Sequence, residues 1–127
     1  MYKSKGKLVF DYLKHTKHFE PWWAMVLCDR EIQRYYAWHL LKWGVKVNIA
    51  SPWGAHISVI KGEAPPDKKK WKLYHGTVLE FEYDPDIKWD NGEHAWANVY
   101  CQQLVDLRVE LGLIYRPRFH LTIGRLD

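Results

Sequence analysis

Cysteine is scarce in this sequence, and long apolar runs are absent. The two cysteines of the 127 residues, Cys28 and Cys101, lie in apolar stretches without C-x-x-C spacing, which predicts free buried thiols in a reducing compartment and no catalytic role. No segment approaches the ~20 apolar residues of a membrane span. The basic N-terminal stretch contains an apolar run too short for a signal peptide. We therefore expect a cytoplasmic protein that makes no contact with a membrane.

Aromatic residues, in contrast, are abundant. They make up 16% of the chain and include eight Trp and eight Tyr, so we expect some of the rings to line a binding site. The net charge is +4 and the pI is near 9.0, a balance that favours an anionic partner such as a phosphate-bearing small molecule or a nucleic acid. The length predicts a single domain over residues 1–127, with a core that needs neither disulfide nor metal.

Hydrophobic periodicity predicts a repeated order of strands and helices. Alternating or short apolar runs indicate strands, and apolar spacings of three and four, closed by Gly44 and Gly112, indicate two helices. Asp29 has the position of a helix cap. The expected elements are strands 7–13 and 22–29, a helix over 30–44, strands 45–50 and 56–63, then strands 76–84 and 95–100, a helix over 101–112 and a strand over 116–126.

Two of the predicted strands carry the same polar pattern. "HISV" sets His56 and Ser58 on one face of its strand, and "HLTI" sets His120 and Thr122 on one face of the last strand, with apolar residues between them. With seven histidines in 127 residues, chance predicts roughly a third of one His-x-Ser/Thr match. One histidine on a strand is usually a structural residue, but two matched pairs point to a shared polar site.

The repeated order predicts the fold. We expect an α+β protein with two pseudo-symmetric lobes, each an antiparallel sheet with a packed helix, flanking a central cleft. In that arrangement the strands that carry His56 and His120 lie on opposite sides of the cleft.

Two histidines can share acid and base roles, because an imidazole titrates near neutral pH. In phosphodiester cleavage one histidine removes a proton from the attacking hydroxyl and the other protonates the leaving oxygen, while Ser58 and Thr122 bind phosphate oxygens. A metal site ranks lower. The pair in "HTKH", His15 and His18, has no cysteine or carboxylate partners in the sequence around it and is typical of a solvated loop. We expect neither a metal ion nor a cofactor.

The paired motifs "HISV" and "HLTI", near the middle and at the end of a two-part chain, resemble those of the 2H phosphoesterase superfamily, which includes LigT-like RNA ligases and 2′,3′-cyclic phosphodiesterases. The resemblance implies general acid and base roles for His56 and His120 and phosphate binding by Ser58 and Thr122. "GAHISVIKGE" and "FHLTIGRLD" look most like the phage anti-CBASS nucleases, which destroy cyclic oligonucleotide signals of bacterial immunity. That likeness implies a cyclic di- or trinucleotide substrate, metal-independent cleavage of 3′,5′ bonds and the cytoplasm of an infected bacterium.

Six further residues are candidates for binding such a substrate. Aromatic rings stack on nucleobases, and cations pair with phosphates. Tyr12 and Trp22 are more typical of a core, and Lys68, Lys69 and Lys70 of a solvated loop. By strict alternation Lys61 and Arg125 point away from the histidine face, and only a strand end or a bulge would turn them toward it. The candidates are Trp53, Trp71, Trp89, Tyr12, Lys61 and Arg125.

Two other functions fit the same sequence. One is hydrolysis of 2′,3′-cyclic phosphates on RNA ends or on small cyclic nucleotides, which needs the same four residues. The other is a non-catalytic module that binds a nucleotide through aromatic rings and lysines. A binding module would keep its affinity without His56, whereas an enzyme would lose turnover. Neither possibility requires a protein partner.

Overall fold

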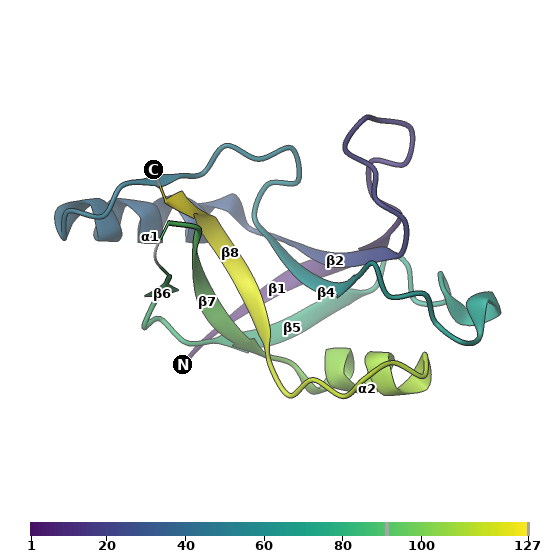
Figure 1. Ribbon diagram of the computed structural model, residues 1–127. Helices are drawn as coiled ribbons and strands as arrows, with labels where there is room; N and C mark the ends of the chain where they lie inside the picture. Colours follow the sequence, from purple (N-terminus) through teal and green to yellow (C-terminus); the bar gives the residue numbers. More distant parts are fainter. Residues whose placement is uncertain (91, 127) are drawn as a thin grey trace.

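Six strands pair antiparallel with one another and form a closed barrel (Figure 1). The computed structural model describes residues 1–90 and 92–126. Its strands are β1 (Tyr2–Phe10), β2 (Trp23–Cys28), β3 (Val47–Asn48), β4 (His56–Lys61), β5 (Val78–Tyr83), β6 (Lys88–Trp89), β7 (His94–Tyr100) and β8 (Phe119–Leu126). Helix α1 covers Arg30–Lys42, α2 covers Gln102–Glu110, and a single 3-10 turn covers Lys68–Lys70.

The strand order is β8-β4-β2-β1-β5-β7, and β8 also pairs with β7, which closes the barrel. The short strands β3 and β6 extend it at β8 and β7. The expectation of an α+β fold with two pseudo-symmetric lobes around a central cleft is therefore wrong. Pairing of β1 with β5 and of β4 with β8 joins the two halves of the chain along both of their edges.

The helices also cross between the two halves of the chain. α1 follows β2 but packs against β8 and β3, and α2 follows β7 but packs against β4. Neither helix therefore serves a lobe of its own. Neither α1 nor α2 is long and apolar enough to cross a membrane, within the part of the chain that the structure describes.

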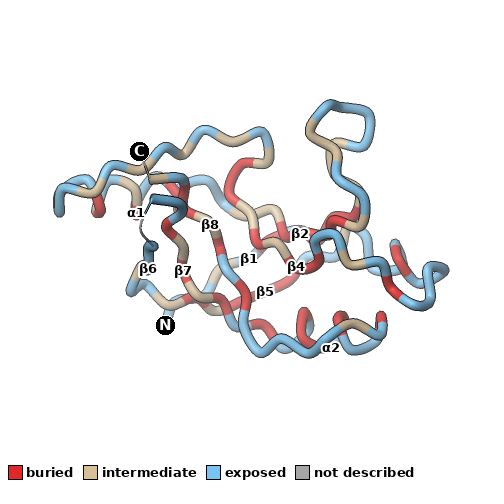
Figure 2. The backbone as a smooth tube through the Cα atoms, in the orientation of Figure 1, coloured by how far each residue is buried: buried red, intermediate tan, exposed pale blue. Residues whose placement is uncertain are grey.

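The barrel strands bury one face in the main core. Ile57, Val59, Leu121 and Ile123 are at most 1% exposed, and buried positions follow the strands and one side of α2 (Figure 2). A smaller cluster of Val9, Trp23 and Met25 packs separately, although it derives from strands that also serve the main core. Because alternate residues of a strand point to opposite faces, the sheet has an apolar layer on both sides at β1 and β2.

Both predicted helices are confirmed: α1 begins at the expected residue and ends two residues early, and α2 begins one residue late and ends two residues early. The Asp29 carboxylate caps α1 by accepting a hydrogen bond from the backbone N–H of Glu31 at 2.9 Å. α1 buries Gln33, Tyr36 and Leu40, which recur along one side of the helix. Gly44 follows with φ +82°, a left-handed conformation that ends a helix at low cost.

β1 and β6 contain strand residues that the sequence prediction lacked, whereas the strand expected over 45–50 shrinks to Val47–Asn48. β1 begins at Tyr2 rather than at residue 7 and ends at Phe10, because Asp11 turns the chain with a φ of +56°. Its early residues Lys3 and Lys5 pair with β5 across the sheet. The sequence did not predict this long-range pairing, because these residues lack the apolar alternation of a strand. The two-residue strand β6 lies between the strands expected over 76–84 and 95–100, where no strand was predicted. Both additions lie away from the His-x-Ser/Thr motifs.

Candidate active site

The two His-x-Ser/Thr motifs lie side by side. β4 and β8 pair antiparallel with His56 opposite Thr122 and with Ile57 opposite Leu121. Directly opposed side chains share one face of a sheet and lie about 5 Å apart at Cβ. Ser58 and His120, the other members of the two motifs, line the same pocket as His56 and Thr122. The four side chains therefore lie together on the face opposite the main core, on neighbouring strands and not across a cleft between lobes.

A bulge in β4 turns Lys61 to this face. The register of β4 against β2 slips by one residue after Ser58, so that Val59 is an extra residue and Lys61 pairs with Trp23. An inserted residue reverses the alternation of the side chains that follow it. Val59 stays buried, and Lys61 lies on the same side as the histidine and serine before it.

A bulge in β8 does the same for Arg125. The register of β8 against β7 slips after Thr122, so that Ile123 is the extra residue and Arg125 pairs with His94. β4 and β8 therefore share one pattern: a histidine, a hydroxyl side chain two residues later, a bulge at the next residue, and a Lys or Arg five residues after the histidine. The sequence predicted that Lys61 and Arg125 could face the site only if each strand ended or bulged before them, and both strands bulge there.

His56 is held by its own backbone. Its Nδ1 lies 3.0 Å from the carbonyl oxygen of Gly54, and because a carbonyl only accepts hydrogen bonds, Nδ1 carries the proton. The lone pair of the neutral ring is then on Nε2. Burial lowers the pKa of His56 below its usual value, the bond to Gly54 opposes this effect, and the charge of Lys61 adds to it. The environment therefore favours the neutral, proton-accepting imidazole.

His120 is held by an aromatic ring. It stacks on Trp96 with ring centroids 4.9 Å apart and an angle of 28° between the planes. The indole of Trp96 is itself fixed, because its Nε1 donates to Asn98 Oδ1 at 3.2 Å. Partial burial lowers the pKa of His120, and the charges of Arg118 and Arg116 lower it further. His120 is the more exposed of the two histidines.

Trp23 contacts both the Ser58 hydroxyl and the Lys61 ammonium of β4. Its Nε1 donates to Ser58 Oγ at 3.1 Å, which leaves the serine O–H available to donate to a ligand. The ammonium of Lys61 lies 4.5 Å from the centroid of the Trp23 ring, within the range of a cation–π contact. The carboxylate of Glu20 lies 3.8 Å from the same ammonium. The indole thus orders both groups at one wall of the site.

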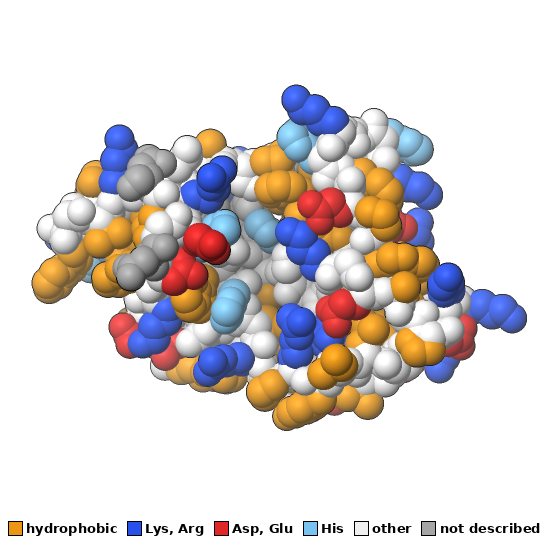
Figure 3. Space-filling model, viewed as in Figure 1, with side chains coloured by type: hydrophobic (Ala, Val, Ile, Leu, Met, Phe, Trp, Pro, Cys, Tyr) orange, Lys and Arg blue, Asp and Glu red, His pale blue; other side chains and the backbone are white. Residues whose placement is uncertain are grey.

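These groups surround a pocket of about 380 Å³. In the space-filling view, histidine side chains stand around a hollow with Lys or Arg side chains beside it (Figure 3). The volume lies within the range typical of small-molecule sites, roughly 300–1,000 Å³. The lining residues are Trp23, Gln33, Asn48, Ile49, Ala50, Ser51, Trp53, Gly54, His56, Ser58, Lys61, Asp90, His94, Trp96, His120, Thr122, Gly124 and Arg125.

The structure brings only one of the four aromatic candidates into this pocket. Trp53 lines it, with its ring centroid 5.9 Å from that of His56. Trp71 is 6% exposed in the main core, where its ring packs edge-on with Phe10 and Trp22. Trp89 lies in a separate groove beside α1. Tyr12 packs against the smaller apolar cluster. The predicted contacts of Trp71, Trp89 and Tyr12 with a substrate are therefore not supported by their positions.

Sequence reasoning missed other members of the pocket. Trp96 and His94 enter from β7, which the strand pairing with β8 places beside the second motif. Gln33 enters from α1 and is 4% exposed. The alternation within residues 95–100 could have put Trp96 on a polar face. Nothing local in the sequence shows that this face adjoins His120, because the pairing joins distant segments.

Other chemistry-bearing residues lie outside the site. His15 and His18 belong to the loop between β1 and β2, where His18 packs edge-on to Trp53. Residues 1–90 and 92–126 contain no group of three His, Cys, Asp or Glu side chains arranged to hold a metal ion. Both cysteines are free, and burial raises the pKa of the Cys28 thiol, which disfavours the reactive thiolate.

The chain matches no family model, no curated protein and no solved structure. The resemblance to 2H phosphoesterases therefore depends on the two tetrapeptide motifs. Chemically, β4 and β8 bring two imidazoles, two hydroxyls and two cations to the pocket, and β7 adds a third imidazole, that of His94. Such a set can bind an anion and move protons at two positions around it.

Proposed function

We propose that this protein is a metal-independent phosphodiesterase that cleaves 3′,5′ bonds of cyclic oligonucleotides and gives linear products. The biological role would be removal of the cyclic di- and trinucleotide signals of CBASS defence, in the cytoplasm of a bacterium infected by phage. The observation that carries the proposal is the pairing of β4 with β8, which sets two His-x-hydroxyl pairs on one face. A binding module needs no such duplication of proton-transfer groups.

The proposed reaction uses the ribose beside the scissile phosphate. One histidine removes the proton of the 2′-hydroxyl, and the 2′-oxygen attacks phosphorus as the bond to the 5′-oxygen breaks. The other histidine gives its proton to that 5′-oxygen. The ring opens to a linear chain that ends in a 2′,3′-cyclic phosphate, and attack by water on that end would give a 3′-phosphate.

The environments of the histidines support a division of roles. The Nδ1–H bond to Gly54 leaves the Nε2 lone pair of His56 available to accept a proton, and burial keeps that ring neutral. We therefore assign His56 as the base. His120 is then the acid, and the stacked Trp96 ring orients it and can stabilise an imidazolium by a cation–π interaction.

The remaining lining groups suit an anionic nucleotide. The hydroxyls of Ser58 and Thr122 can donate to the non-bridging phosphate oxygens, and Lys61 and Arg125 supply positive charge at the same pocket. Trp53 offers a ring close to His56 for stacking on a base. Stacking of this kind contributes ~1–3 kcal/mol per base.

A substrate panel tests the proposal. The purified chain is incubated in EDTA with 3′,3′-cyclic dinucleotides, cyclic trinucleotides, a 2′,3′-cyclic mononucleotide and an RNA that ends in 2′,3′-cyclic phosphate. Products are identified by mass spectrometry, with His56→Ala and His120→Ala alongside. We expect ring opening of the cyclic oligonucleotides that is lost in both variants.

The other outcomes contradict the proposal in different ways. Turnover of the terminal cyclic phosphates alone would assign the protein to RNA end processing. Binding without turnover, unchanged in His56→Ala, would identify a nucleotide-binding module. A requirement for an added divalent metal would contradict the two-histidine mechanism.

A further inference from the structure

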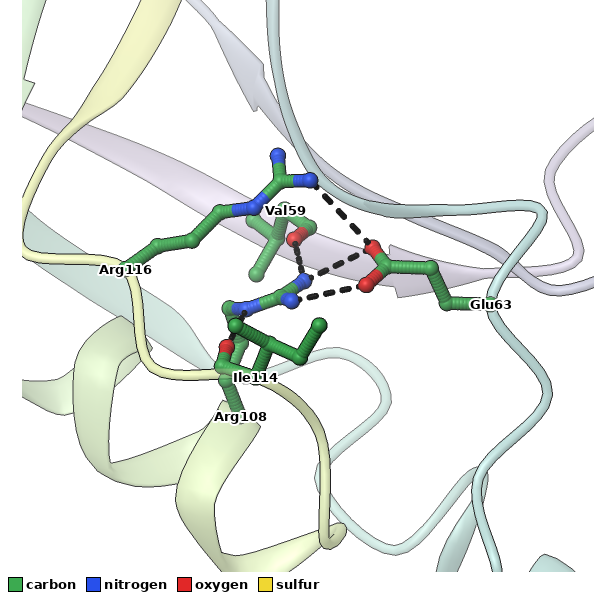
Figure 4. Close-up of polar contacts among 5 residues, drawn as sticks. All are labelled: Val59, Glu63, Arg108, Ile114 and Arg116. Carbon is green, nitrogen blue, oxygen red and sulfur yellow. Dashed lines mark hydrogen bonds and ion pairs between the residues drawn. The ribbon is translucent and has the colours of Figure 1, made fainter.

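Within residues 1–90 and 92–126, one charged side chain is completely buried. Arg108 of α2 has no exposed surface, and its guanidinium points toward Glu63 and the carbonyl oxygen of Val59 (Figure 4). Nη1 and Nη2 bind the two carboxylate oxygens of Glu63 at 2.9 and 2.8 Å. Nε donates to the carbonyl oxygen of Ile114 at 2.9 Å. With one further bond, these contacts pair four of the five N–H groups of the guanidinium, in keeping with the rule that buried polar groups are hydrogen-bonded.

The remaining contact of Arg108 is on the bulge of β4. Nη1 also donates to the carbonyl oxygen of Val59 at 2.8 Å, and Val59 is the extra residue that reverses the alternation of the strand. A bulge leaves a backbone group of the extra residue without a partner in the neighbouring strand. Here the guanidinium of Arg108 binds the carbonyl oxygen of that residue, Val59.

Lys61 lies between the two anchors of the guanidinium. Val59 precedes it by two residues and Glu63 follows it by two, and Arg108 holds both. Gly62 between them has a φ of +72°, and its N–H donates to the carbonyl of Trp22 at 3.0 Å. The backbone on both sides of Lys61 is therefore tied down, although half of the lysine side chain remains exposed.

Stability alone does not account for this arrangement. Apolar residues in place of a buried ion pair often leave stability unchanged or raise it. A bidentate pair in a fixed geometry is, however, a precise way to hold a backbone.

We infer that Arg108 and Glu63 form a clamp that positions Lys61 for binding a substrate phosphate by locking the bulge at Val59. The inference rests on the proposed function to the extent that Lys61 meets a phosphate. Arg108 does not line the pocket and is a positioning residue, not a catalytic one.

The test measures binding of inorganic phosphate and does not depend on turnover. Phosphate is titrated in EDTA while the NMR signals of the His56 and His120 rings are followed. The variants are Lys61→Met, the clamp variant Arg108→Met with Glu63→Leu, and their combination. Lys3→Met with Glu80→Leu is the matched control, because it removes an ion pair of the same charges (3.9 Å apart) away from the pocket.

We expect Lys61→Met to weaken phosphate binding about tenfold, the scale of one charge-assisted hydrogen bond. The clamp variant should weaken it by a similar factor although Lys61 is intact. The combined variant should bind no more weakly than Lys61→Met alone, because groups that act through one another are not additive. The control pair should bind like the wild type.

Three results would overturn the inference: wild-type affinity in a folded clamp variant, losses that multiply in the combined variant, or no phosphate binding by the wild type. If the clamp variant does not fold, Arg108→Lys is judged by the same criteria, since an ammonium cannot form the bidentate contact. Clamp-dependent phosphate binding in a protein without turnover would contradict the proposed function and leave this inference standing.

Discussion

At the scale of single residues, the two histidines of the site differ in what holds them. A backbone carbonyl fixes the tautomer of His56, whereas a stacked indole fixes the ring plane of His120. The motifs that introduce them are nearly identical in sequence. The difference in environment therefore comes from neighbours, and it is the basis for assigning them different roles.

Removal of either imidazole should abolish most of the turnover. We expect His56→Ala and His120→Ala each to lower kcat by roughly 100- to 10,000-fold, the usual contribution of a general acid or base. His15→Ala, which alters an exposed loop histidine, is the control. Steady-state kinetics on a cyclic dinucleotide measures the effect, with circular dichroism to verify folding. A decrease in kcat of less than tenfold in either variant would exclude the replaced histidine as acid or base.

The turnover should depend on pH as a bell with its optimum below about 6.5, the ordinary pKa of histidine. Burial lowers the pKa of both rings. At neutral pH the proposed base, His56, is therefore unprotonated as its role requires, but the proposed acid, His120, has also lost its proton. Turnover should rise as the pH falls toward these values, then fall when the base is protonated too. A kcat profile from pH 4.5 to 9 tests this, and an optimum at pH 8 would contradict it.

At the scale of elements, bulges determine the composition of the site. In β4 and β8 the extra residue follows the hydroxyl directly, and the cation comes two residues after the extra one. Without the bulges, Lys61 and Arg125 would point toward the core. The sequence contains the lysine and arginine at matched spacings, but a register slip depends on the partner strand.

A side chain at Gly124 should disturb the second bulge. A Cβ at this position would overlap the carbonyl oxygen of Asn48 and the side chain of Val47 on β3. We expect Gly124→Ala to lower the free energy of unfolding by about 1–3 kcal/mol, as overpacking does, and to weaken phosphate binding through Arg125. Urea denaturation and phosphate titration measure the two effects.

Gly44→Ala separates steric overlap from the general cost of replacing a glycine. Gly44 has open space around it but a positive φ, so this variant should lose stability without losing phosphate affinity. Equal phosphate affinities in wild type and Gly124→Ala would show that β3 does not support the site.

At the scale of the whole molecule, closure of the barrel makes one unit of the two halves of the chain. β8 bonds to β4 on one side and to β7 on the other, and each helix packs on a strand from the other half. The site therefore lies at a seam, where β4 from the first half meets β8 from the second. Neither half contains both His-x-Ser/Thr motifs.

This architecture should unfold in one step. We expect tryptophan fluorescence and far-ultraviolet circular dichroism to report the same urea midpoint, because neither half retains a closed sheet when the other unfolds. Ligand-free protein in EDTA is sufficient for the measurement. Two separated transitions would indicate independent lobes and contradict the closed barrel.

Much of the local structure was predictable because it depends on neighbours in the chain. Apolar spacing and the Asp29 cap predicted both helices, and alternation put His56 with Ser58 and His120 with Thr122. The lobed fold was not correct, since helix packing and strand closure involve segments far apart in sequence. The aromatic residues were an incomplete guide for a similar reason: Trp53 lines the pocket, but a tryptophan such as Trp71 can pack in a core as readily as against a ligand.

The sequence by itself determined which side chains share a strand face before each bulge, where the helices begin and end to within two residues, and that two matched His-x-Ser/Thr pairs exist. Only the tertiary structure decided that the two faces adjoin, that two bulges add Lys61 and Arg125, and that a buried Arg108 supports one bulge. Dihedral preferences and periodicity act over a few residues, so the sequence displays them directly. Strand pairing and register are set by hydrogen bonds between distant segments, and they form only when the whole barrel closes.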